Sequence, residues 1–276
     1  MESNLFRVLA PPEILKRDVE CFILNRFSGN RRVEIRVFSN GIPGIAFHHT
    51  DGHPAIESIR TQSGRETSPP SLFVCGPGTE SSRMRFEKGS YTVVQVILKP
   101  HALKTLLGIN ALALKNQAVE LNEFSNEDLN EQLLNTPDEN MHMKLLAGFL
   151  VSKLQQANTR DTLVEKSLSL IHQSRGAMNV GALARYLDLS ERQLERRFSQ
   201  TVGLSPLSYI RVRRFNEAMR LMKTGGYKRL TDVAYALNFH DQSHFIREIK
   251  SFTGVTPKSL LQSVDDFYHN QAGYSY

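Results

Sequence analysis

The chain has 276 residues, 40% of them hydrophobic and 22% charged, with a net charge of +6; these values are typical of a globular protein with one large domain or two ordinary ones. No apolar run is long enough to cross a membrane and the N-terminus lacks a secretory signal pattern, so we expect a cytoplasmic protein with no membrane partner. Cys21 and Cys75 match no metal-ligand spacing and predict two free thiols rather than a disulfide framework.

Residues 18–98 have the pattern of β-strands. Residues 32–37 (Arg-Val-Glu-Ile-Arg-Val) alternate strictly, and residues 91–98 form a mostly apolar run rich in β-branched side chains. Turn signals such as Asp51-Gly52 and Gly76-Pro77-Gly78 interrupt this block at short intervals. We therefore expect a mainly antiparallel barrel or sandwich.

Residues 100–157 have helical patterns instead. Pro100 suits the first turn of one helix, Ser125 the cap of a second helix over 126–135, and Asp138 the cap of a third over 139–156. The third helix is expected to bury one face, formed by Met141, Leu145, Phe149 and Leu150. A further helix is predicted in residues 161–176 as a linker. The sequence leaves open whether these apolar faces pack on the barrel or pair two protomers in a homodimer.

The charge becomes uneven beyond this point. Residues 1–174 carry 19 basic and 19 acidic side chains, whereas residues 175–260 carry 15 basic against 7 acidic, a net +8. A basic segment behind a neutral one is expected where one domain meets a polyanion. Charge alone leaves DNA, RNA and a membrane surface open.

An internal repeat lies within the basic segment. Residues 183–189 (Leu-Ala-Arg-Tyr-Leu-Asp-Leu) align with residues 233–239 (Val-Ala-Tyr-Ala-Leu-Asn-Phe). Both copies end in a Gly-x-x-Pro pattern, Gly203-Leu-Ser-Pro206 in the first and Gly254-Val-Thr-Pro257 in the second. Each copy predicts a short helix, a tight turn and a second helix, with a long spacer helix from Ser205 to Met222 between the copies. The second helix of each copy is amphipathic, so its polar face is free to enter a groove.

These residues resemble the DNA-binding domain of the AraC/XylS family. The resemblance covers residues 179–261, about 30% of the chain. It implies a transcription regulator, with activation favoured, whose partners are double-stranded DNA and RNA polymerase. Base contacts carried over position by position fall on Arg192, Glu195 and Arg196 in the first recognition helix and on Gln242, Ser243, His244 and Arg247 in the second. Ser190, Gln193, Arg197, Asp241 and Lys250 complete the predicted DNA-binding set.

The order of strands then helices upstream resembles the cupin-like sensor domain of many family members. The predicted fold class is accordingly a two-domain chain: an α+β N-terminal domain with an antiparallel cupin-like barrel, and an all-α C-terminal domain with two helix-turn-helix units joined by a long helix. The predicted boundaries are 1–160 for the regulatory domain, 161–176 for the linker helix, 177–262 for DNA binding and 263–276 for a C-terminal tail. The sequence leaves open whether the regulatory domain binds a small-molecule effector, and which one.

Two other functions remain as alternatives. His49, Asp51 and His53 would share one face of a strand, which would suit a metal-dependent cupin-type enzyme fused to a DNA-binding module. Asp51-Gly52 favours a turn there, however, and we predict no metal site, no catalytic residue and no cofactor. An architectural DNA-binding protein with little sequence preference is the other alternative, but phosphate binding needs only Lys and Arg, and the two polar faces are more varied than that.

Overall fold

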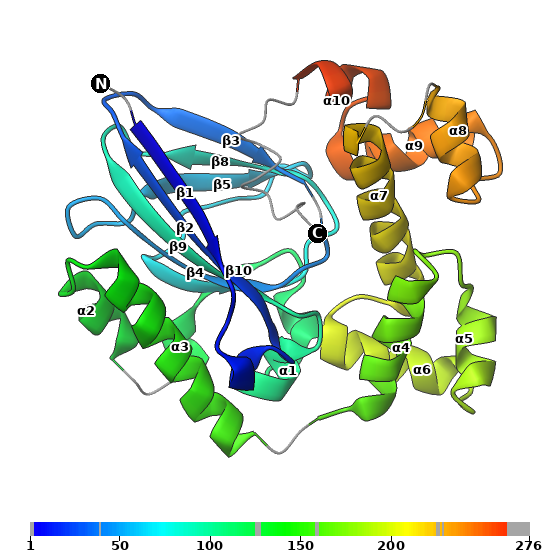
Figure 1. Cartoon of the computed structure of the whole chain (residues 1–276), viewed down its shortest axis with the longest axis horizontal. Helices are drawn as coiled ribbons and strands as arrows, with labels where there is room; N and C mark the ends of the chain where they lie inside the picture. Colours follow the sequence, from blue (N-terminus) through cyan, green and yellow to red (C-terminus); the bar gives the residue numbers. More distant parts are fainter. Residues whose placement is uncertain are drawn as a thin grey trace.

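A computed structural model describes residues 3–38, 40–124, 128–157, 160–224, 227 and 229–263. These residues form a β-rich N-terminal domain and a helical C-terminal domain that lie side by side (Figure 1). The predicted fold class is therefore confirmed. The proposed cap at Ser125 and most of the predicted tail lie outside the described residues.

The N-terminal domain is built from two antiparallel sheets. The six-stranded sheet has the order β1-β2-β9-β4-β7-β10 and the four-stranded sheet has the order β3-β8-β5-β6. Two strands, β1 and β10, lie outside the 18–98 block. In chain order the strands are β1 (Ser3–Leu9), β2 (Val19–Ser28), β3 (Val33–Val37), β4 (Gly44–His49), β5 (Ile56–Thr61), β6 (Glu66–Thr67), β7 (Leu72–Cys75), β8 (Ser82–Phe86), β9 (Tyr91–Leu98) and β10 (Ala118–Glu120).

Apolar side chains fill both faces of the six-stranded sheet. Phe27, Phe73 and Tyr91 point toward the four-stranded sheet and pack with Phe86 from β8. On the other face, Val94 and neighbouring residues pack against the helices of this domain. These helices are α1 (Ala102–Leu107), α2 (Leu129–Leu134) and α3 (Glu139–Gln156), with short 3₁₀ turns η1 (Glu13–Leu15), η2 (Ala111–Leu114) and η3 (Leu121–Phe124).

The buried face of α3 differs from the prediction. Asp138 caps the helix as expected, because its side chain accepts a hydrogen bond from the Asn140 amide. Met141, however, is 40% exposed, and the inward face includes His142 and Leu146 instead. The His142 Nε2 atom lies 3.0 Å from the Leu133 carbonyl oxygen, so this contact fixes the rotation of α3 against α2. The spacing of apolar residues, on which the prediction is based, does not reveal that a histidine occupies the buried face.

The histidine cluster does not form the face that a metal site would need. His48 is fully buried, and its Nδ1 atom accepts hydrogen bonds from the backbone amides of Ala55 and Ile56. Burial lowers the pKa of His48 to about 4, so this side chain is neutral near pH 7. Asp51 and Gly52 form the expected turn, both with positive φ. Among the described residues, no three potential metal ligands lie close together.

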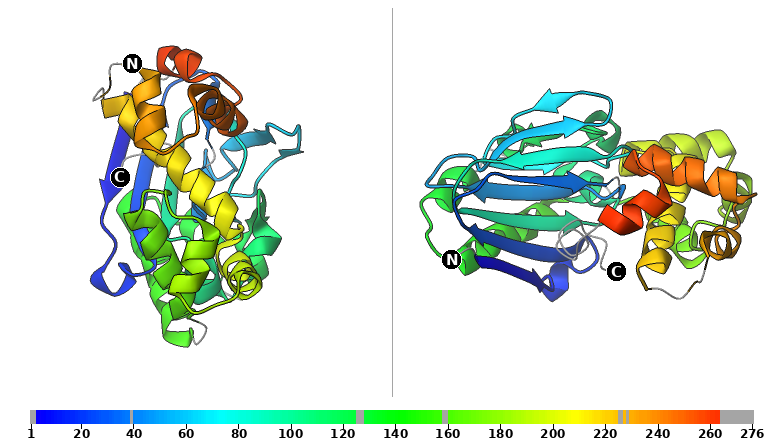
Figure 2. Two further views of the ribbon diagram at one scale, coloured as in Figure 1. Left: turned by 90° about the vertical axis from the view of Figure 1, so that its right-hand side faces the viewer. Right: turned by 90° about the horizontal axis from the view of Figure 1, so that it is seen from above.

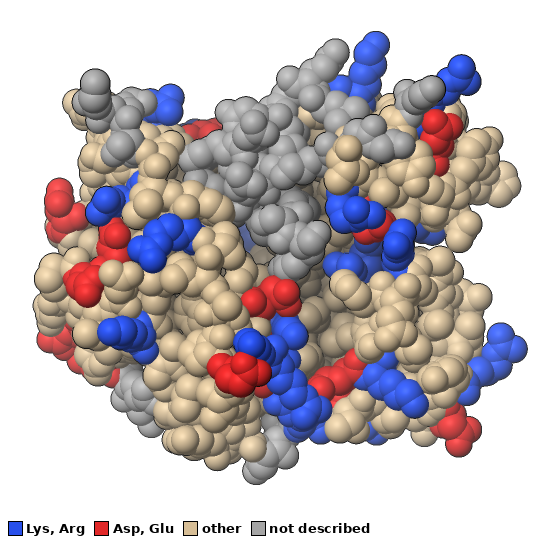
Figure 3. Space-filling model, in the orientation of Figure 1, with Lys and Arg blue, Asp and Glu red and all other residues tan. Residues whose placement is uncertain are grey.

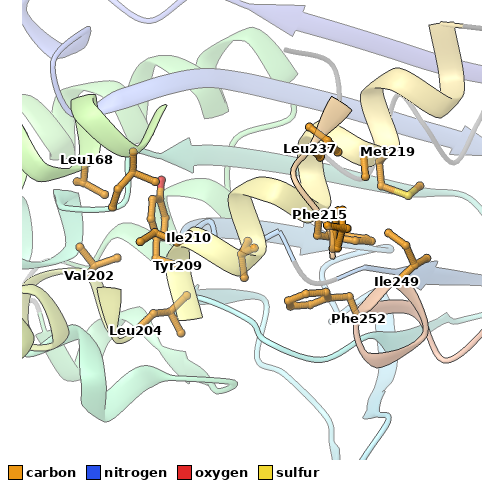
Figure 4. Close-up of a cluster of buried hydrophobic side chains, with 14 of the residues drawn as sticks. Leu168, Val202, Leu204, Tyr209, Ile210, Phe215, Met219, Leu237, Ile249 and Phe252 are labelled. Carbon is orange, nitrogen blue, oxygen red and sulfur yellow. The ribbon is translucent and has the colours of Figure 1, made fainter. Parts of the chain in front are cut away.

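The C-terminal domain consists of helices around one apolar core (Figure 4). Side chains from all parts of the spacer helix contribute to this core, including Tyr209, Phe215 and Met219. No helix within the described residues is long and apolar enough to cross a membrane. The helices are α4 (Thr162–Gln173), α5 (Val180–Tyr186), α6 (Glu191–Val202), α7 (Pro206–Thr224), α8 (Leu230–Ala236), α9 (Gln242–Thr253) and α10 (Pro257–Ser263).

A group of ion pairs joins the two domains at α4. Asp18 is fully buried, and its carboxylate accepts hydrogen bonds from Arg160 at 2.8 Å and 3.0 Å and lies 3.1 Å from His101 Nε2. Burial raises the pKa of Asp18, but the hydrogen bonds from His101 and Arg160 outweigh this effect and hold the pKa below its usual value. Glu165 on α4 pairs with Arg160 and Arg17. The predicted linker helix is thus attached to the N-terminal domain.

Candidate nucleic-acid interface

The two copies of the repeat have the same backbone structure. Asp188 and Asn238 occupy equivalent places in the turns, and both have φ of 54°, in the left-handed region that few residues other than glycine adopt. The next amide closes each turn at the same distance, 3.0 Å from Leu189 to the Ala184 carbonyl and 3.0 Å from Phe239 to the Ala234 carbonyl. The sequence repeat therefore corresponds to two helix-turn-helix units, α5–α6 and α8–α9.

The second helix of each unit also starts and ends alike. The Ser190 hydroxyl accepts from the Gln193 amide and the Gln193 side chain accepts from the Ser190 amide, which makes a capping box. Asp241 caps α9 by accepting from the His244 amide. Gly203 and Gly254 then end α6 and α9 in left-handed conformations, with φ of 80° and 74°. Ser190, Gln193 and Asp241, all in the predicted DNA-binding set, thus form helix caps.

The predicted base-contacting residues of α6 are available to a ligand. Leu194 and Phe198 are buried, whereas Arg192, Glu195 and Arg196 are exposed on the opposite face. Arg197 differs from its neighbours. Its guanidinium makes two hydrogen bonds of 3.0 Å to the Asp161 carboxylate, which attaches α6 to α4. Arg197 belongs to the predicted DNA-binding set, but because of this contact we do not include it in the proposed DNA-binding residues.

The corresponding residues of α9 divide in a similar way. Gln242, Ser243, Arg247 and Lys250 are exposed. His244 is partly buried, with its ring 5.4 Å from that of Phe239 in an edge-on arrangement. Phe245 and Ile249 fill the core on the other face, as the spacing predicts. Gln242, Ser243 and Arg247 lie in the N-terminal half of the helix, which is where recognition helices contact bases.

Glu248 is a structural residue of α9 that the sequence analysis did not identify. It is 5% exposed, and its carboxylate accepts hydrogen bonds of 2.9 Å and 2.8 Å from Arg211 on α7. Arg214 lies 3.5 Å away and stacks over the Phe239 ring. Burial raises the pKa of Glu248, but Arg211 and Arg214 outweigh it and hold the pKa below its usual value. A glutamate at an inward position is a usable signal, because a buried charge needs a partner.

Comparison with known proteins also identifies helix-turn-helix units in this part of the chain. Residues 183–263 match a family of helix-turn-helix domains, and residues 7–120 match a domain of unknown function, DUF6597. The chain is 31% identical over 90 residues to the HTH-type transcriptional activator RhaS of Escherichia coli strain SE11, a match that covers 33% of this chain and 32% of RhaS. The C-terminal domain is an AraC-type helix-turn-helix domain. The resemblance to the AraC/XylS family is confirmed in this part of the chain.

A longer match extends beyond the AraC-type domain. The uncharacterized HTH-type transcriptional regulator YidL of Escherichia coli K12 is 28% identical over 156 residues, which is 52% of this chain and 52% of YidL. The chain thus spans about half the length of this relative and about a third of RhaS. Among solved structures, ToxT of Vibrio cholerae aligns over 87% of this chain and 97% of its own, with 16% identity and a TM-score of 0.46.

Positive charge on the surface agrees with the uneven charge of the sequence. Over the AraC-type domain in Figure 3, Lys and Arg side chains outnumber Asp and Glu, whereas both signs alternate over the N-terminal domain. Two of the spacer arginines, Arg211 and Arg214, are engaged with Glu248. The exposed Arg192, Arg196 and Arg247 therefore account for much of the positive charge on the recognition helices.

A cavity of about 260 Å³ lies inside the N-terminal barrel. Mainly apolar residues of both sheets line it, among them Ala46, Phe73 and Met84, and Gln95 contributes an amide. The connection between β3 and β4 lines it too, through Phe38. Phe38 is 3% exposed and belongs to the apolar core of the AraC-type domain. One side chain thus contacts both the cavity wall and the other domain.

Proposed function

We propose that this protein is a sequence-specific DNA-binding transcription regulator, in which residues 177–262 bind DNA and residues 1–160 regulate that binding. The observation that carries the proposal is the pair of equivalent units, each with varied polar side chains exposed on its second helix. Arginine donates two hydrogen bonds to a guanine edge, and glutamine donates one hydrogen bond to an adenine edge and accepts one from it, whereas phosphate binding would need positive charge alone. One chain would then read two successive segments of the major groove.

The proposal is tested by selecting binding sites for the full chain from random-sequence DNA and footprinting it on the selected site. We expect two protected segments per chain, about one helical turn apart. Replacing Arg196 or Arg247 by alanine should weaken specific binding by about 1 to 3 kcal/mol and relax the preference at one base position each. Arg32→Ala, in an exposed position of the N-terminal domain, is the matched control. Equal losses on selected and random DNA would reduce these arginines to phosphate contacts.

The direction of regulation follows by analogy. RhaS is named an activator, and on that basis we propose activation through contact with RNA polymerase, in the cytoplasm. A reporter gene behind the selected site should lose expression when the protein is deleted, and increased expression would instead make it a repressor. Dimerisation stays a prediction, which analytical ultracentrifugation of the full chain would test.

We also propose that the barrel cavity binds a small-molecule effector. An apolar cavity of about 150 Å³ takes up benzene, so one of about 260 Å³ suits a molecule of one or two rings. The lining is mainly apolar but includes Gln95, Arg36 and Glu80, so we expect a largely apolar molecule that carries at least one polar group. Ala46→Leu should fill the space, because Ala46 lines it and is 6% exposed. Small aromatic probes should raise the melting temperature of the wild type and of a Val8→Leu control, but not of Ala46→Leu. The idea fails if no probe separates these variants.

A further inference from the structure

The outer face of the four-stranded sheet carries a row of arginines. In the strand register, Arg36 on β3 lies directly opposite Arg83 on β8, and Arg83 lies directly opposite Arg60 on β5. Strands in a sheet are about 4.8 Å apart, so the three side chains span about 10 Å across adjacent strands. Ile35 and Met84, the neighbours of Arg36 and Arg83 in sequence, pack inward, which leaves the arginines on the outer face.

This arrangement is unfavourable in the absence of a ligand. Like charges directly opposite each other destabilise a sheet. Glu34 lies 3.3 Å from Arg83 and 3.6 Å from Arg85, so it offsets part of the charge on β8. No ion pair or side-chain hydrogen bond links the guanidinium of Arg36 or Arg60 to any other described residue. Glu66 on β6 lies directly opposite Arg60 in the strand register, but the two side chains form no ion pair. Within the described structure, Arg36 and Arg60 thus have no carboxylate within ion-pair distance.

The row lines a cleft at the edge of the C-terminal domain. The cleft has a volume of about 430 Å³, and its charged lining consists of four arginines and two glutamates, Glu34 and Glu66. Thr253 and Gly254, at the end of α9, form the opposite wall. Seen from above in Figure 2, α9 and α10 lie beside the ends of these strands. The N-terminal domain is neutral as a whole, so a net positive cleft is a local feature.

We propose that the Arg36–Arg83–Arg60 row binds a small phosphorylated molecule. A guanidinium forms two parallel hydrogen bonds to a phosphoryl group, and a phosphoryl group carries nearly two negative charges and three acceptor oxygens. Three guanidinium groups spread over about 10 Å suit an anion with more than one phosphoryl group, such as a diphosphate. The strand register fixes the relative backbone positions of the three arginines, and the anion offsets the repulsion between their side chains. This cleft shares Arg36 with the lining of the barrel cavity and adjoins the C-terminal end of α9, but none of the proposed base-contacting residues lines it.

The experiment is calorimetric titration of the full chain with inorganic pyrophosphate at low ionic strength, where charge interactions are least screened. We expect one saturable site in the wild type. Arg36→Gln and Arg60→Gln should each weaken binding at least about tenfold, since each removes charge-assisted hydrogen bonds to the anion. Arg60→Lys keeps the charge but loses the paired geometry, so its loss should be smaller. Arg7→Gln, at an exposed position of β1, is the matched control and should bind as the wild type does.

Thermal unfolding separates a ligand site from a structural role. Without pyrophosphate, Arg36→Gln should melt at or above the wild-type temperature, because it relieves repulsion from Arg83. Arg60→Gln should melt near the wild-type temperature, because the lost repulsion from Arg83 is offset by the lost attraction to Glu66. A clear fall in melting temperature would mean that the arginines stabilise the domain junction, and would overturn the proposal. The absence of a saturable site in the wild type would overturn it too, as would an equal loss in Arg7→Gln. If pyrophosphate does not bind and Arg60→Gln weakens binding to duplex DNA, the row is instead part of a DNA-binding surface.

Discussion

The two helix-turn-helix units share a local structure but are held in place by different contacts. The first unit is attached to α4 by Arg197 and Asp161, and its end packs closely on the N-terminal domain, where a Cβ on Gly203 would lie 2.6 Å from the Ala111 carbonyl oxygen. The second unit is attached to α7 through the buried Glu248. At Gly254 the nearest atom to a Cβ would be 3.8 Å away, in the side chain of Gln62. The repeated residues determine the local structure, and residues outside the repeat determine how each unit is anchored.

Replacing the two equivalent glycines, Gly203 and Gly254, by alanine should give the largest difference between the units in the free energy of unfolding. Both glycines have positive φ, which costs an L-residue about 1 to 2 kcal/mol. At Gly203 the added methyl would also overlap backbone atoms of Ala111, and overpacking of this kind typically costs a further 1 to 3 kcal/mol. We expect Gly203→Ala to lower the free energy of unfolding by about 3 to 4 kcal/mol and Gly254→Ala by about 1 kcal/mol.

Urea denaturation of the two variants measures this difference directly. Each variant serves as the control for the other, since both lose the same C-terminal glycine of a recognition helix. Equal losses would show that the packing of the first unit on the N-terminal domain contributes nothing beyond the backbone strain, and the contrast between the units would disappear.

Breaking the ion pairs that anchor each unit, those of Glu248 and of Arg197, should give a smaller difference in the free energy of unfolding. Glu248→Ala would leave Arg214, which is 17% exposed, without its carboxylate. Breaking a buried pair costs about 3 to 5 kcal/mol, and because Arg211 is 42% exposed we expect about 2 kcal/mol. Arg197→Ala should cost at most about 1 kcal/mol, as for a pair near the surface. If Arg197→Ala is the more damaging variant in urea denaturation, the α4 contact is the stronger anchor.

The contrast between the units also explains what the sequence could predict. The turns, the caps at Ser190 and Asp241 and the exposed face of α6 follow from residues within a few positions of one another, so pattern and spacing determine them. The partners of Arg197 and Glu248 lie 36 and 37 residues away along the chain. No periodicity predicts contacts of that range. The same limit applies to Phe38, whose place in the core of the other domain depends on how the domains dock.

In the N-terminal domain, the sequence analysis missed strand β1 and the buried position of His142 for a similar reason. The edge strand β1 pairs with β2 alone among the described strands, and adjacent apolar residues at Leu5 and Phe6 hide its alternation. The inward place of His142 on α3 depends on carbonyl groups of the preceding helix and turn. A stripe of hydrophobic residues in the sequence indicates only the apolar part of such an interface and does not reveal its polar contacts.

Acid should loosen the second unit before the first, and this is the smallest effect we predict. The pKa of Glu248 is lowered in the folded protein, so the contribution of this carboxylate to stability is complete above its ordinary pKa of 4.5 and is lost as the pH falls through the lower, folded value. The first unit, residues 180–203, contains no buried Asp or Glu. Protonating Glu248 would remove its charge while Arg211 and Arg214 stay charged, which weakens the contact between α7 and α9.

Residue-resolved amide exchange at pH 7 and at pH 3.5 tests this order, with each rate expressed as a protection factor so that the intrinsic pH dependence of exchange cancels. Protection in α9 should fall severalfold more than protection in α6. Glu248→Gln provides the control, since an amide does not titrate, and its α9 should exchange faster at pH 7 with no further loss specific to α9 in acid. Solvent screening of the half-exposed Arg211 keeps the expected effect small. If α6 loses protection first, or if Glu248→Gln keeps the wild-type acid response, the loosening begins elsewhere and Glu248 does not anchor the second unit.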